Sequence, residues 1–181
     1  MTQEAGEVAL SKQDLREVTA FAAACAETVL RVFEADRPGD SRPRDALEAA
    51  WEFARGGERG KALRDRAWAA LKASKSAETA ASCEAARAAM AAAAAAYLHP
   101  LAKATQVKHI LGAGAHAARA LELLADDRTA SAGHLAQSVR RATPAVVAVL
   151  TRFPAAPEGG GRVGELTRAL DAGLRSLAST G

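Results

Sequence analysis

Alanine makes up about a quarter of this chain, and its runs favour helix over other regular structure. Residues 91–96 are six consecutive alanines, asparagine is absent, and isoleucine occurs once. Alanine has the highest intrinsic helix propensity, and the β-branched residues that favour strands are sparse here. The sequence therefore predicts an all-α protein with no sheet.

The clearest helix is predicted over residues 12–34. Ser11 and Asp14 have the spacing of a capping box at its start. Apolar residues then recur at alternating three- and four-residue steps: Leu15, Val18, Ala22, Cys25, Val29 and Val32. This spacing places one apolar stripe along the helix, which predicts a helix packed on a core.

Glycine and proline divide the rest of the chain into further helices. Ser76 and Thr105 are predicted to cap the fourth and fifth helices. The fourth helix has almost no polar face beyond Arg87, which is typical of a helix at the centre of a bundle. We expect a bundle of about seven helices in a single domain, with the fourth and fifth helices at its centre. The helices after the first are predicted over residues 43–55, 58–73, 76–97, 105–124, 131–141 and 145–153.

The domain organisation follows from the same breaks. Residues 1–10 are expected to be a disordered N-terminus, and residues 11–153 the helical bundle. Residues 154–162 hold two prolines and three consecutive glycines, which predicts a linker loop. Residues 163–181 form a last helix that docks on the bundle or on a second copy, which would make a homodimer.

Charge and cysteine content narrow the function classes. The chain has 24 lysine and arginine residues against 21 acidic residues, and the two signs are interleaved along it. Only seven residues are aromatic, which leaves few side chains for stacking on bases. Nucleic-acid binding is therefore disfavoured. The uncharged stretch at residues 88–100 is too short to span a membrane. The N-terminus lacks an export signal, and Cys25 and Cys83 form no metal-type pair. These features favour a cytoplasmic protein with reduced thiols.

The segment GGERGK, residues 56–61, superficially resembles a phosphate-binding loop. A Walker loop needs four residues between its glycines and a hydroxyl after the lysine. Only three residues separate Gly56 from Gly60, and Ala62 stands at the hydroxyl position. We therefore expect a helix-to-helix corner that binds no ATP.

Three histidines and three arginines are the candidate site residues. His109 and His116 project from one face of the fifth helix, and His99 lies in the loop before it. Packed core histidines, a polar groove, and acid–base or metal chemistry all fit this pattern, although the seven-residue spacing is not the i, i+4 pair that grips one metal. We expect no metal, no cofactor and no catalytic residue, because no catalytic or cofactor signature is present.

The arginines cluster on the second and third helices. Arg42, Arg44 and Arg64 either form ion pairs that brace this helical hairpin or offer anchors for a partner protein.

Four segments in this order resemble a family of small helical bacterial proteins described as immunity proteins of polymorphic-toxin systems: DSRPR (40–44), FARG (53–56), AARAA (85–89) and HILGA (109–113). The resemblance covers roughly residues 10–125. Relatives sometimes carry the label exonuclease SbcC, but this chain lacks the nucleotide loop and long coiled coil of such an ATPase. The resemblance implies a non-catalytic cytoplasmic protein that binds and neutralises a toxin-like partner.

Two alternatives stay open from the residues alone. One is a helical enzyme or small-ligand-binding protein whose pocket is lined by histidine and arginine. The other, less favoured, is a nucleic-acid-associated protein.

Overall fold

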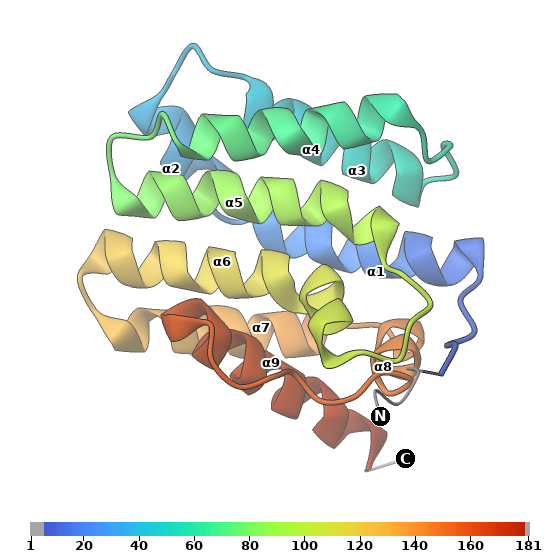
Figure 1. Ribbon diagram of the computed structural model, residues 1–181. Helices are drawn as coiled ribbons and strands as arrows, with labels where there is room; N and C mark the ends of the chain where they lie inside the picture. The colour runs from blue at the N-terminus through green and yellow to red at the C-terminus, as the bar shows by residue number, and fades with distance from the viewer. Residues whose placement is uncertain (1–5, 180–181) are drawn as a thin grey trace.

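The computed structural model describes residues 6–179. Within that range the chain folds into nine α-helices and three short 3-10 helices without a strand (Figure 1). The prediction of an all-α protein is confirmed, and the predicted number of about seven helices is wrong. The α-helices are α1 (Lys12–Glu27), α2 (Leu30–Asp36), α3 (Arg42–Ala54), α4 (Lys61–Ser74), α5 (Ala80–Ala94), α6 (Lys108–Ala125), α7 (Ser131–Arg141), α8 (Pro144–Leu150) and α9 (Gly161–Ala178).

One additional helix comes from a break in the helix predicted over residues 12–34. The Thr28 hydroxyl donates to the Cys25 carbonyl at 2.7 Å, and Val29 leaves helical geometry with φ −115°. A side-chain hydroxyl that bonds a nearby backbone carbonyl offers the chain an alternative to the helix. The apolar stripe nevertheless continues across the break, since Val29 is fully buried.

The helix caps agree with the sequence in some places and differ in others. Ser11 and Asp14 form the predicted capping box of α1, with both bonds present. The cap predicted at Ser76 is wrong, because Thr79 accepts from the Ser82 amide and caps α5. Thr105 is not a cap either, since it lies inside the 3-10 helix η2 (Ala104–Val107) that precedes α6.

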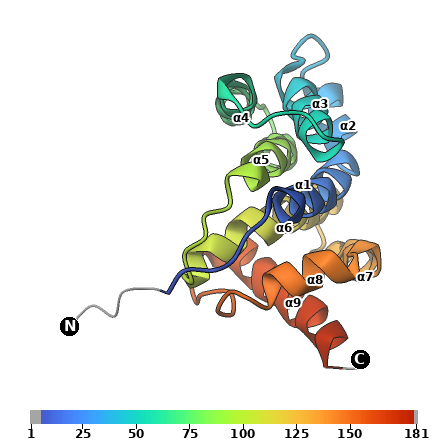
Figure 2. The ribbon, with the colours of Figure 1, turned by 90° about the vertical axis from the view of Figure 1, so that its right-hand side faces the viewer.

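The helices α5 and α6, which correspond to the predicted fourth and fifth helices, lie at the centre. Contacts link α5 to α1, α2, α3, α4 and α6, and they link α6 to α1, α5, α7 and α9. Seen from the side in Figure 2, α4 and α5 lie on one side of the upper part of the molecule, with α3 and α1 on the other. Small side chains permit this close packing: a Cβ on Gly114 of α6 would lie only 2.8 Å from Cδ2 of Leu170 on α9.

The N-terminal segment runs beside the loop that follows α5. The predicted disordered N-terminus falls outside the described residues over 1–5. Residues 6–10 lie within them: the Val8 amide donates to the Pro100 carbonyl, and the Ala102 amide donates to the Gly6 carbonyl, each at 2.9 Å. Val8 is buried, so this segment is packed against the bundle.

The loop at residues 154–160 lies along α9. Asp171 accepts the Ala156 amide at 3.1 Å, and Arg175 donates to the Phe153 carbonyl at 3.1 Å. The apolar edge of α9 buries Leu166, Leu170 and Leu174 against α6, α7 and α8.

In the part of the chain that the structure describes, we find no helix with the length and apolar character needed to cross a bilayer.

Candidate functional site

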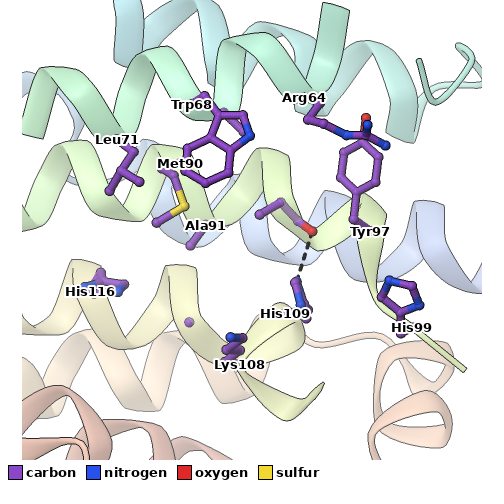
Figure 3. A pocket seen from close by; sticks show the side chains of 13 residues that line it. Arg64, Trp68, Leu71, Met90, Ala91, Tyr97, His99, Lys108, His109 and His116 are labelled. Carbon is purple, nitrogen blue, oxygen red and sulfur yellow. Dashed lines mark hydrogen bonds between the residues drawn. The ribbon is translucent and has the colours of Figure 1, made fainter. Parts of the chain in front are cut away.

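A groove opens between α4 and α6, above α5, with a volume of about 580 Å³. Figure 3 shows α4 along its upper side, α5 in the middle and α6 below. The lining comprises Arg64, Ala67, Trp68 and Leu71 of α4, Met90, Ala91 and Ala94 of α5, Tyr97 and His99 after it, and Lys108, His109, Gly112 and His116 of α6. Its volume lies in the usual range for binding sites in proteins.

The groove exists because the residues between its walls are small. The floor is formed largely by Ala91, Ala94 and Gly112, which leave the space between α4 and α6 unfilled. A Cβ added to Gly112 would meet only the Cβ of Ala91, at 3.8 Å, which is ordinary van der Waals contact. The alanine-rich sequence of α5 therefore both packs the core and leaves an open groove on the outer side.

His116 lies at one end of the groove and is held by a buried carboxylate. Its Nδ1 donates to Oε2 of Glu84 at 2.6 Å, and Nη1 of Arg87 donates to Oε1 of the same residue at 2.9 Å. Burial alone would raise the pKa of Glu84, but the hydrogen bond from His116 and the nearby charges of His116 and Arg87 hold it below its usual value. Glu84 is therefore ionised, and it fixes the proton of His116 on Nδ1.

His109 is held by a backbone carbonyl instead. Its Nδ1 donates to the Ala94 carbonyl at 3.1 Å, a bond drawn in Figure 3. Burial lowers the pKa of His109, and the neighbouring Lys108 and His99 lower it further. The ring is neutral near pH 7, so Nε2 is left as a hydrogen-bond acceptor.

Tyr97 closes the other end of the groove between two guanidinium groups. Arg64 lies 5.2 Å and Arg59 5.5 Å from the centre of its ring. The Tyr97 hydroxyl donates to the Gly60 carbonyl at 2.8 Å, and Arg59 donates to the Ala96 carbonyl at 3.0 Å. These contacts tie the corner between α3 and α4 to the end of α5.

That corner is the GGERGK segment, residues 56–61. It follows a helix, α3, and Gly56 has φ +117°, a conformation that L side chains rarely adopt. The Gly56 carbonyl accepts from Arg16 at 2.8 Å. The segment is thus a helix-to-helix corner held by an arginine.

The structure brings together the three candidate histidines and one of the three candidate arginines. His99, His109, His116 and Arg64 all line the groove. Arg42 instead contacts Asp40 at 2.8 Å and Ser76 at 3.1 Å, beyond the far end of α4, and Arg44 pairs with Glu34. Arg42 therefore braces the hairpin, Arg44 joins α3 to α2, and both lie outside the groove lining.

Trp68 is the main feature of the groove that the sequence analysis missed. It is 58% exposed, although tryptophan is usually well buried. A signal existed in the sequence, because Arg64, Trp68 and Leu71 follow one another at i, i+4 and i+7. This second stripe on α4 lies beside the buried one formed by Leu63, Ala67 and Ala70.

Two buried polar clusters lie elsewhere in the bundle. Glu122 is enclosed at the junction of α6, α7 and α9; burial alone would raise its pKa, but hydrogen bonds from Arg162, Ser131 and Arg119 lower it to about 2. His134 is also buried, and burial lowers its pKa. Its Nε2 lies 3.4 Å from the Ser138 hydroxyl. Both clusters join helices and neither opens into the groove.

Histidine, cysteine and carboxylate side chains do not gather into a metal-binding group anywhere among residues 6–179. His109 and His116 stand two turns apart along α6 and contact different partners.

The comparisons with known proteins identify one family. A family model described as "Imm-5 like putative immunity protein" matches residues 9–145. The matched region contains α4, α5 and α6, which form the groove. No curated protein and no solved structure matches the chain.

Proposed function

Because the chain belongs to the Imm-5 like putative immunity protein family, we propose that it binds and neutralises a toxin-like partner protein in the cytoplasm. The partner would dock over the groove between α4 and α6. This function requires recognition and no catalysis by the chain itself.

The observation that carries the proposal is the exposure of Trp68 at the edge of an open groove. Binding hot spots are enriched in tryptophan, tyrosine and arginine. Trp68, Tyr97 and Arg64 supply all three residue types within one lining. A tryptophan that stays exposed contributes little burial free energy to folding, and occlusion by a partner would bury its apolar surface.

Co-expression with a candidate toxin-like protein tests the proposal. The wild type should restore growth to cells that produce this protein and should co-purify with it as a stable complex. Trp68→Ala should weaken both effects. Leu124→Ala is the matched control, because Leu124 is 61% exposed and lies outside the groove. A wild type that neither binds nor protects would refute the proposal.

The groove also supports a second candidate function, a small-ligand-binding protein or enzyme. The supporting observation is its volume together with the histidines that line it. Native mass spectrometry of the purified protein should then show a retained small molecule. The double variant His109→Ala, His116→Ala should release it. Retention of the molecule in that variant would show that these histidines do not form its binding site.

A further inference from the structure

We propose that the groove between α4 and α6 accepts one acidic, amphipathic α-helix of the partner protein. The inference rests on the proposed function and specifies the part of the partner that is recognised. It follows from the shape of the groove, from its apolar surface and from the sign of its charges.

The shape suits a helix. The walls α4 and α6 both pack on α5, which lies between them in Figure 3. The lining runs from Arg64 to Leu71 on one wall and from Lys108 to His116 on the other. At 1.5 Å per residue these stretches are about 10–12 Å long, which is about two helical turns. Small residues on the floor allow the backbone of a docked helix to approach closely.

The apolar part of the lining can hold side chains that repeat along a helix. Trp68 and Leu71 descend from α4 toward Met90 on α5 (Figure 3). Methionine is flexible and polarisable, so Met90 can adapt to an inserted side chain. Recognition of a helix in such a groove uses apolar anchors at i, i+3 or i+4, and i+7.

The charges of the groove select an acidic helix. No aspartate or glutamate lines it, whereas Arg64 stands on one wall and Lys108 on the other. Both side chains are exposed, and neither forms an ion pair with a carboxylate of the described residues. The nearest buried carboxylate, Glu84, is already engaged by His116 and Arg87. Carboxylates flanking the apolar anchors of a helix would pair with both walls.

Gly112 provides a variant that adds a side chain at the floor of the groove. A Cβ fits there, since its nearest neighbour is 3.8 Å away, and leucine favours helix more than glycine does. Gly112→Leu should therefore fold and block the floor. Leu124→Ala again serves as the control outside the groove.

Selection from a displayed library of helical peptides tests the inference. Each peptide is about 20 residues long and has fixed apolar anchors at i, i+4 and i+7. The flanking positions are randomised between glutamate and lysine. The full chain serves as the bait, and enriched peptides are measured against the wild type and the variants by fluorescence anisotropy.

The expected result is enrichment of glutamate at the flanking positions. Affinity should fall at least tenfold in Gly112→Leu, in Trp68→Ala and in the charge reversal Arg64→Glu, Lys108→Glu, and should stay unchanged in Leu124→Ala. Circular dichroism of each variant checks that the fold is retained. Enrichment of lysine, absence of any enriched peptide, or equal binding by Gly112→Leu overturns the inference.

Two other occupants are distinguished by measurements on the same proteins. Sedimentation that shows a dimer separated into monomers by Gly112→Leu would assign the groove to a second copy. Native mass spectrometry that shows a small molecule released by Gly112→Leu would assign it to that ligand. Either result overturns the inference.

The two proposals fail separately. If the toxin-like partner is neutralised while no acidic helix is selected, only the helix inference is wrong. If acidic helices are selected while no partner is bound or neutralised, the specificity of the groove stands and the immunity function is wrong.

Discussion

The imidazole of His116 and the carboxylate of Glu84 lie 2.6 Å apart, with Nδ1 as the donor, at one end of the groove. The two residues are 32 positions apart on α6 and α5, so the bond joins the two central helices. Glu84 is 9% exposed, which places this hydrogen bond in a largely dehydrated setting.

Glu84→Ala should destabilise the fold by about 1–3 kcal/mol, because it leaves the partly buried side chains of His116 and Arg87 without their acceptor. It should also shift the proton of His116 from Nδ1 toward Nε2, the position usually preferred by a free ring. Urea denaturation measures the first effect and nitrogen-15 NMR the second. An Nδ1 proton that persists unchanged in Glu84→Ala would show that the carboxylate does not orient the ring.

Glu122 should make stability depend on pH in the acid range. Its folded pKa of about 2 lies below the ordinary 4.5. At pH values between these two, the unfolded chain therefore binds more protons than the folded chain. The stabilisation is fully present above the ordinary pKa and is lost as pH falls from about 5 toward 2, up to about 3 kcal/mol. The Glu122→Gln variant should be less stable than the wild type at pH 7, and its free energy of unfolding should change less with pH across this range. Parallel pH profiles of the two proteins would contradict the assignment.

Thr79→Ala should lower stability by about 1 kcal/mol, because it removes the side chain that caps α5. Thr105→Ala should have little effect, since the Thr105 side chain is exposed and lies inside a 3-10 helix without a side-chain cap bond. Thermal denaturation of both variants provides the comparison. Equal losses would mean that the assignment of the caps is wrong.

Cys83 should react with a thiol reagent before Cys25 does. Cys25 is fully buried, and burial raises the pKa of its thiol, whereas Cys83 is partly exposed. Mass spectrometry after brief treatment of the native protein should show one modified site, and treatment in denaturant two. Modification of Cys25 first would contradict the packing of α1 against α6.

Trp68→Ala should change stability by less than about 0.5 kcal/mol, because the side chain is 58% exposed. It should weaken binding of the partner by at least about 2 kcal/mol, as expected for a hot spot. Calorimetry measures both quantities on the same sample. A large loss of stability with unchanged binding would make Trp68 a structural residue.

The sequence predicted the helical class because alanine content and apolar periodicity are local properties. It could not predict the break at Thr28, where a single hydroxyl competes with the helix, nor the choice of Thr79 over Ser76 as the cap of α5. Each depends on geometry at one residue. Propensities averaged over a segment do not register such choices.

The candidate site could be predicted only in part, because some of its features depend on contacts between helices. The stripe on α6 places His109 and His116 on one face, which periodicity can show. The pairing of His116 with Glu84 joins two helices, and the gap between α4 and α6 depends on how both pack on α5. These are relations between distant segments, which one sequence does not display.

The bond from the Tyr97 hydroxyl to the Gly60 carbonyl makes the α3–α4 corner a spacer of fixed length. Inserting one residue between Gly57 and Gly60 would displace the start of α4 relative to the end of α5. The mouth of the groove would then change in width although none of its lining residues had been replaced. Variation in the length of this corner would give related chains a route to new partners that leaves the core untouched.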